Sequence, residues 1–151
     1  APEPPPPSLP DAWRNEAAVL CVAGRGIFDA QASAMLEQVL ERQGFGVRVL
    51  RLDGLRAAAG TAPMAVVFST VAGGSGAVTV RHALRRAQRM FPEARRMVGV
   101  WGAAREQGLV TELKEEGMPI LTSLRGTREA LVQAATGDPA GDGRAEKRVA
   151  A

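Results

Sequence analysis

Short apolar runs alternate along this chain with stretches in which apolar residues recur every three or four positions. The runs cover residues 19–23, 47–52, 64–68, 97–101 and 118–121. Runs of this length that are apolar on both faces are typical of strands buried in a parallel sheet. In the second run, the alternating Arg48 and Arg51 favour a more exposed position near the edge of the sheet.

Helical periodicity separates these runs. In the clearest example, five apolar residues share one helix face: Ala32, Met35, Leu36, Val39 and Leu40. Gly44 and Gly46 follow as stop signals. The spacing predicts further helices over residues 53–59, over about 80–91 before Pro92, and over about 109–113 before Gly117. A last helix is predicted over 128–135, with Thr127 as its N-cap.

Strict alternation of strands and helices places the strands in parallel and the helices on both faces of the sheet. The pattern therefore predicts a three-layer α/β domain of the flavodoxin-like or Rossmann-like kind. Its five-stranded parallel sheet is expected to have the strand order 2-1-3-4-5.

The two ends of the chain lack this alternation. Residues 1–12 hold six of the ten prolines, which predicts an extended linker without a packing face. Residues 137–151 mix glycine, proline, alanine and charged residues without periodicity, which predicts a disordered tail. The folded domain is therefore expected to cover residues 13–136.

Composition narrows the class of protein. A hydrophobic content of 46% supports one core, and a net charge of +3 is modest for a general nucleic-acid binder. No apolar run approaches the roughly 20 residues of a membrane-spanning helix, so we expect a soluble chain. The single cysteine, Cys21, lies within the first apolar run, which favours a core residue and a reducing compartment.

In open parallel sheets, ligands bind at the carboxyl ends of the strands, which here means the loops after strands one, three and four. The first loop contains Gly24-Arg25-Gly26 and resembles part of a dinucleotide fingerprint, with Asp53 in place for a ribose. Asp29 stands where that fingerprint needs a third glycine. The alternative is that Gly24 and Gly26 only make a tight turn and that Asp29 caps the helix.

The loops after strands three and four supply the other candidate ligand-binding residues. The loop after strand three contains Ser69, Thr70, Gly73, Gly74 and Ser75. It could hold an anion or act as a lid, although it lacks the ending of a P-loop, and it could equally be an ordinary mobile loop. Trp101 and Gly102 follow strand four.

Five basic residues fall on one outward arc of the helix predicted over about 80–91: Arg81, His82, Arg85, Arg86 and Arg89. They form either a contact face for an acidic partner or an ordinary solvated face. No aromatic residue is interleaved with them, so nucleic acid is not expected. His82 is the only histidine, and it lies on this exposed arc with no cysteine or second histidine near it, so neither a zinc site nor a Ser-His-Asp triad can be assembled convincingly. No catalytic residue, metal or cofactor is predicted.

With the strands placed, the order of motifs resembles the cobalamin-binding type of flavodoxin-like domain. In that family a Ser-x-Leu-like motif follows strand three and a glycine-rich segment follows strand four, where this chain has Ser69-Thr70-Val71 and residues 98–102. The family's Asp-x-His-x-x-Gly loop, which supplies the histidine on cobalt, is replaced here by residues 24–29. Cobalamin is therefore not expected as the ligand.

Residues 19–26, 34–40 and 81–86 resemble the cytoplasmic C-terminal domain of some proteobacterial membrane permeases, in the family of autoinducer-2 exporter-like transporters. The resemblance implies a cytoplasmic domain tethered to the inner membrane by the proline-rich start. The membrane portion of its own parent protein would then be a partner. A start at Ala1 rather than methionine agrees with a piece of a longer protein.

Three functions follow from these observations. The first is a non-catalytic regulatory, sensory or interaction domain of a bacterial membrane transporter, which binds a small ligand or a partner at the loops containing Gly24, Ser69 and Gly102. The second is a nucleotide- or dinucleotide-binding protein, or an enzyme, that uses the degenerate glycine-rich loop and Asp53. The third is a domain that forms a homo-oligomer through exposed apolar residues.

Overall fold

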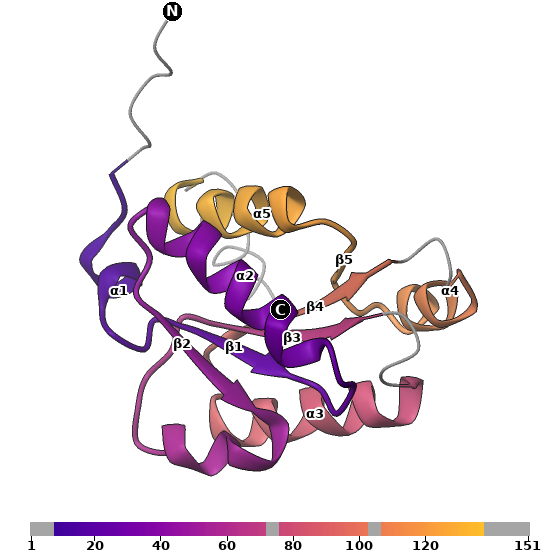
Figure 1. Ribbon diagram of the computed structural model, residues 1–151. Helices are drawn as coiled ribbons and strands as arrows, with labels where there is room; N and C mark the ends of the chain where they lie inside the picture. Colours follow the sequence, from indigo (N-terminus) through magenta and orange to yellow (C-terminus); the bar gives the residue numbers. More distant parts are fainter. Residues whose placement is uncertain (1–7, 72–75, 103–106, 138–151) are drawn as a thin grey trace, which may run out of the picture.

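The computed structural model describes residues 8–71, 76–102 and 107–137, and it has three layers, with a parallel sheet between two layers of helices (Figure 1). The strands are β1 (Val19–Ala23), β2 (Val47–Arg51), β3 (Ala65–Val71), β4 (Arg95–Trp101) and β5 (Ile120–Leu121). Their order is β2-β1-β3-β4-β5, and each neighbouring pair is parallel. This arrangement is flavodoxin-like, so the predicted fold class and strand order are confirmed.

Helices cover both faces of the sheet (Figure 1). The elements are α1 (Asp11–Arg14), α2 (Asp29–Arg42), the 3-10 helix η1 (Leu52–Ala58), α3 (Ala77–Met90), α4 (Gln107–Glu115) and α5 (Leu124–Thr136). One apolar cluster joins α1, α2 and α5 to one face of the sheet, and a second joins η1, α3 and α4 to the other. None of the helices within the described ranges is long and apolar enough to cross a bilayer.

Strand β1 shows why both clusters form. Its five residues are all buried. Because side chains alternate along a strand, Val19 and Cys21 pack toward α2 while Leu20 and Val22 pack toward α3. The edge position predicted for β2 is also found, since β2 pairs only with β1 within the described sheet.

Strand β3 extends further than the strand predicted from the apolar run at residues 64–68. It continues to Val71 because β4 pairs with it along its whole length, from Ala65 with Arg95 to Val71 with Trp101. Ser69 and Thr70 are consequently buried strand residues and not loop residues. The prediction that they belong to the loop after this strand was wrong, because pairing with β4 outweighed their polar character.

The last helix, α5, begins at Leu124, which is earlier than the predicted range of 128–135. Ser123, and not Thr127, is its N-cap, and the Ser123 hydroxyl oxygen accepts a hydrogen bond of 2.9 Å from the Gly126 backbone N–H. Thr127 lies inside the helix, where its hydroxyl donates to the Ser123 carbonyl at 2.9 Å. Gly126 in the first turn obscured the apolar periodicity that would have indicated the true start.

The buried stripe of α2 differs from the predicted one. The side of α2 that faces the sheet carries Asp29, Ser33, Leu36 and Leu40. Met35 is 56% exposed, although its spacing predicted burial. Two polar residues, Asp29 and Ser33, thus lie on the buried side of this helix, and the apolar Met35 lies on its exposed side.

Packing begins before residue 13. The segment expected as a linker is described from Ser8, and within it Leu9 is buried against the cluster that contains Trp13 and Phe45. A Cβ added at Gly44 would lie in van der Waals contact with Leu9 Cδ1, and the Gly46 backbone N–H donates to the Trp13 carbonyl at 3.0 Å. The start of the described chain is therefore part of the domain's core.

Candidate ligand-binding site

A hollow of about 360 Å³ opens at the carboxyl ends of β3 and β4. It is lined around the start of α2 by Phe28, Gln31, Ala32 and Met35, at the strand ends by Val71, Trp101 and Gly102, and before and at the start of α5 by Thr122, Ser123 and Leu124. None of these residues carries a charge, so we refer to this site as the apolar hollow. It lies at the end of the sheet where open parallel α/β domains bind ligands, and its volume is within the range of small-molecule pockets.

Large apolar side chains are exposed beside the apolar hollow. Phe28 and Met35, which line it, are each 56% exposed, and the neighbouring Ile27 is 84% exposed. Isolated exposed apolar residues are common on protein surfaces, but a group of them around a concave site indicates contact with an apolar partner or ligand.

Trp101 forms the inner wall of the apolar hollow. A Cβ added at Gly99 would overlap the Trp101 indole, so the ring lies directly against the backbone of its own strand. Nε1 of Trp101 is buried and has no hydrogen-bond partner among the described residues. The same is true of Oγ of Ser69, a residue of β3 that lies opposite Gly99 in the register of β3 and β4. Any alanine at position 99 would therefore have to displace the ring.

The carboxylate of Asp29 occupies the first loop. Its Oδ2 accepts from the Gly26 backbone N–H at 3.0 Å, and its Oδ1 accepts from the Val71 backbone N–H at 2.8 Å. Asp29 is fully buried, and its side chain does not cap its own helix, whose N-cap residue is Phe28. The expected cap is thus replaced by a link between the first loop and the end of β3. In a dinucleotide site the N–H of Gly26 would face a pyrophosphate, but here it donates to the side chain of Asp29.

The other residues predicted as ligand contacts lie in several places. Gly24 directly follows strand β1 and is buried, and Arg25 is exposed on the first loop. Asp53 is exposed on η1, beyond the edge strand β2, and does not line the apolar hollow. Among the predicted contacts that the structure describes, Trp101 and Gly102 line it. Gly73, Gly74 and Ser75 lie outside the described residues.

The sequence interpretation did not single out most of the lining. No sequence motif marks Phe28 and Met35 at the start of α2, or Thr122 and Leu124 at the start of α5, as ligand contacts. One signal was present: Ile27 and Phe28 are two large apolar residues in a turn, where no core requires them. The contribution of α5 could not be recognised, because its start was predicted too late.

The basic arc of α3 divides into different roles. Arg81 forms ion pairs with Glu112 of α4 and with Glu116, the residue after α4, at 2.6 and 2.7 Å. Arg86 donates to the Leu52 carbonyl at 3.0 Å. The hydrogen bonds between Arg81 and Glu116 raise the pKa of the arginine and lower that of the carboxyl. His82, Arg85 and Arg89 are exposed. Within the described ranges, no group of three potential metal ligands occurs.

Cys21 is fully buried in the sheet, as its position in an apolar run predicted. Burial raises the pKa of its thiol, and the charges of Glu37 and Glu41 raise it further. A thiolate is therefore strongly disfavoured there, and the thiol is a core group.

Comparisons of the chain with protein-family models, curated proteins and solved structures gave no significant match.

Proposed function

We propose that this domain is a non-catalytic binding module that takes an uncharged, largely apolar small molecule in the apolar hollow. The observation that carries the proposal is the coincidence of three properties in one place. The hollow lies at the ligand-binding end of a flavodoxin-like sheet, its described lining has no charged side chain, and Phe28 and Met35 leave apolar surface exposed on its rim. Covering that surface would stabilise a complex by about 25 cal/mol per Å² removed from water.

The chemistry of the lining supports binding over catalysis. General acid or base catalysis needs a titratable group within hydrogen-bond reach of the substrate, and the described lining offers only the amide of Gln31 and the hydroxyls of Thr122 and Ser123. These three groups can orient a ligand through a few hydrogen bonds. The nucleotide alternative is disfavoured because the Asp29 carboxylate occupies the Gly26 N–H that would face a phosphate.

The test measures binding of Nile red, a neutral dye that fluoresces in apolar surroundings. A neutral probe avoids attraction to the arginines of α3. We expect saturable binding of one dye per chain, with emission of Trp101 quenched at the same dye concentrations. Ala32→Phe, which fills the hollow, and Met35→Asp, which places a charge on its rim, should each weaken binding at least tenfold.

The matched control is Val78→Asp. Val78 is 76% exposed on α3 and does not line the hollow, so this variant removes a comparable exposed apolar side chain elsewhere. It should change dye affinity less than twofold. Equal losses in Val78→Asp and Met35→Asp, or unchanged binding to Ala32→Phe, would contradict the proposal.

A thermal-shift screen distinguishes the classes of natural ligand. At 100 times its dissociation constant, a ligand stabilises the protein by about 2.7 kcal/mol. Neutral apolar compounds should produce this shift in the wild type and not in Ala32→Phe. Stabilisation by nucleotides, flavins or cobalamin, with equal shifts in both proteins, would favour a different site and overturn the proposal.

We further propose that the module regulates a membrane transporter to which it is attached. The proline-rich start and the resemblance to the cytoplasmic domains of exporter-like permeases support this narrower function. The gene sequence upstream of Ala1 tests it directly. Several apolar segments of membrane-spanning length are expected there, and a short upstream region without them would overturn the attachment but not the ligand site.

A further inference from the structure

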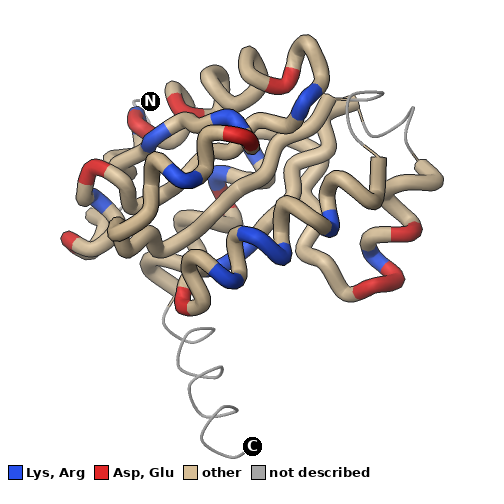
Figure 2. The backbone as a smooth tube through the Cα atoms, turned by 90° about the horizontal axis from the view of Figure 1, so that it is seen from below, with Lys and Arg blue, Asp and Glu red and all other residues tan. Residues whose placement is uncertain are grey.

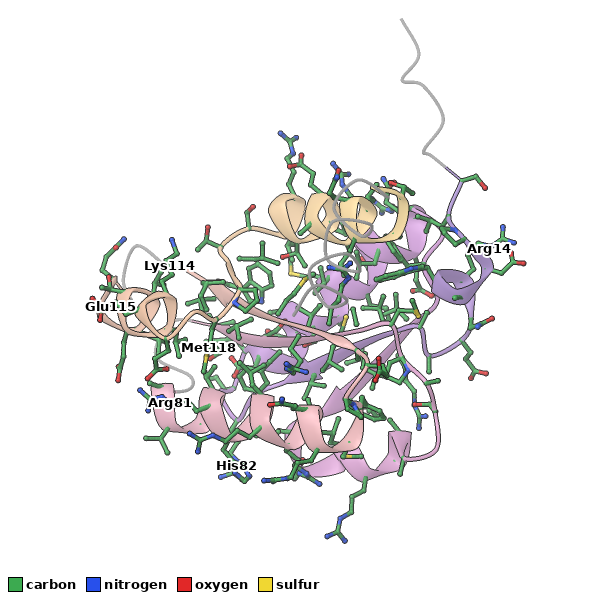
Figure 3. All side chains as sticks on the ribbon, turned by 180° about the vertical axis from the view of Figure 1, so that it is seen from behind. Arg14, Arg81, His82, Lys114, Glu115 and Met118 are labelled. Carbon is green, nitrogen blue, oxygen red and sulfur yellow. The ribbon has the colours of Figure 1, made fainter. Side chains whose placement is uncertain are left out.

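A second concave surface lies at the opposite end of β4 from the apolar hollow. This groove of about 610 Å³ runs between α3, the start of β4 and the turn before β5. Four arginines line it, Arg81 and Arg85 from α3 and Arg95 and Arg96 from β4. No acidic residue is among its described lining, so we call it the arginine groove. Figure 3 shows Arg81 on α3 and Met118 above it, between α3 and α4.

Two carboxylates offset only part of this charge. Arg81 forms ion pairs with Glu112 of α4 and with Glu116, which directly precedes the turn at Gly117 that lines the groove. Glu116 also interacts electrostatically with Arg85. The two glutamates neutralise at most half of the four guanidinium charges, and within the described ranges Arg85, Arg95 and Arg96 form no ion pair. Figure 2 shows the basic positions following one another along α3.

The groove also contains an incomplete sheet edge. Strand β5 pairs only with Val98 and Gly99, although β4 starts three residues earlier, at Arg95. The Arg95 N–H donates toward β3, to the Met64 carbonyl, and the Val98 N–H donates toward β5, to the Pro119 carbonyl. Successive residues of a strand direct their amide groups to opposite sides, so the N–H and C=O of Arg96 point toward the β5 side.

The chain beside Arg96 does not complete the ladder. Pro119 has no N–H to donate, and the Met118 N–H donates to the Leu113 carbonyl at 3.1 Å. Among the described residues, the Arg96 N–H has no backbone acceptor. An open strand edge of this kind is a template for an added extended segment, and guanidinium groups match carboxylates in bidentate geometry.

We propose that the arginine groove binds an extended acidic segment of a partner protein, which pairs its main chain with β4 at Arg96. Alternation along β4 directs Arg96 to the face of Val98 and Arg95 to the face of Met97. Adjacent acidic residues of the bound segment therefore meet arginines on both faces of the sheet, with Arg85 joining Arg96. Leu84 and Met118 supply apolar contacts between the charges. A peptide fits better than inorganic phosphate because a peptide main chain offers a C=O and an N–H at the spacing of a strand ladder, which matches the N–H and C=O of Arg96.

The experiment selects displayed random octapeptides on the intact chain and measures the affinity of the enriched sequences at low and high salt. We expect enrichment of peptides with at least two adjacent Asp or Glu residues. Arg85→Glu should weaken their binding at least tenfold, and binding should fall as NaCl rises from about 50 to 500 mM because the Debye length shrinks. Replacing the central residue of a selected peptide with proline should weaken binding as well, since proline has no N–H.

Arg89→Glu is the matched control, with the same charge change on an exposed residue of α3 that does not line the groove. It should change affinity less than twofold. Both positions are exposed on a helix surface, so both variants should keep the wild-type circular dichroism spectrum and melting temperature. The proposal is overturned by a failure to enrich acidic peptides, by equal losses in the two variants, by displacement with equimolar inorganic phosphate, or by undiminished binding of the proline peptide.

Discussion

At the scale of single residues, the least expected feature is the buried carboxylate of Asp29. It bridges the first loop and the end of β3 through the backbone N–H groups of Gly26 and Val71. Both of these N–H groups would lose a partner without it, and an unpaired buried polar group costs about 1–3 kcal/mol. The residue that disrupts a dinucleotide fingerprint in the sequence is thus a structural link in the fold.

We predict that Asp29→Asn lowers the free energy of unfolding by about 1–3 kcal/mol, because the two N–H groups bind different carboxylate oxygens and asparagine replaces one of these acceptors with an NH2 donor. Chemical denaturation with guanidinium measures the change. Asp53→Asn is the control, since Asp53 is exposed and makes no side-chain hydrogen bond within the described ranges, and it should stay within about 0.5 kcal/mol of the wild type. Equal effects of the two substitutions would contradict the role assigned to Asp29.

Cys21 gives a second residue-scale prediction, based on the raised pKa of its buried thiol. A raised folded-state pKa favours the neutral thiol in the fold, so its contribution to stability is present below the unfolded pKa of about 8.5 and is lost as pH rises above it. Between pH 8 and 10 the wild type should therefore lose more stability than Cys21→Val. In the native state at pH 8, a thiol reagent should label Cys21 only as fast as the protein opens, and rapid stoichiometric labelling would contradict this.

At the scale of elements, the start of α5 matters for both fold and function, because Thr122, Ser123 and Leu124 line the apolar hollow. We predict that Ser123→Ala lowers the free energy of unfolding by about 0.5–2 kcal/mol through loss of the N-cap. Thr122→Ala removes a neighbouring exposed hydroxyl without a side-chain hydrogen bond among the described residues, and it should be nearly neutral. Denaturation of both variants without ligand tests the assignment, and a larger loss in Thr122→Ala would contradict it.

The apolar runs predicted each strand of the described sheet, because a parallel sheet buried on both faces demands continuous apolar residues. The alternation of strands with helices predicted their order. The ends of elements were less predictable, since tertiary pairing sets them. Pairing with β4 extends β3 through Ser69 and Thr70, and a serine cap starts α5 before its apolar periodicity is visible.

The apolar hollow was predicted only in part for a related reason. The topology predicts at which end of the sheet the hollow lies. Trp101 and Gly102 are predicted as lining residues because they stand at the carboxyl end of the fourth strand. Phe28, Met35 and Leu124 come from segments that only the fold brings together. Met35 matches helical core spacing as well as Leu36 does, so periodicity alone cannot separate the rim residue from the core residue.

At the scale of the whole molecule, the two concave surfaces differ in chemistry and lie at opposite ends of β4. The apolar hollow adjoins Trp101 at its carboxyl end, and the arginine groove adjoins Arg95 and Arg96 at its amino end. One strand thus connects a site suited to a small apolar molecule with a surface suited to an acidic segment. This separation lets each be mutated without altering the other.

The core itself extends into the segment that resembled a linker, and this leads to a prediction about the stability of the whole domain. Trp13 is 4% exposed and packs edge-on against Phe45, with ring centroids 6.0 Å apart. A Cβ at Gly46 would collide with the Asn15 carbonyl, which shows how closely this segment lies on the chain before β2. Trp13→Ala should therefore lower the free energy of unfolding by about 3–5 kcal/mol, as removal of a large buried aromatic side chain does.

Leu9→Ala should cost about 2–5 kcal/mol for the same reason, since Leu9 is 5% exposed in the same cluster. Met35→Ala, which removes a side chain that is 56% exposed, should stay within about 0.5 kcal/mol of the wild type. Guanidinium denaturation followed by circular dichroism measures all three. A linker without packing contacts would leave Leu9→Ala and Trp13→Ala as stable as Met35→Ala, whereas an integral segment makes both variants unfold at lower denaturant concentration in a single cooperative transition.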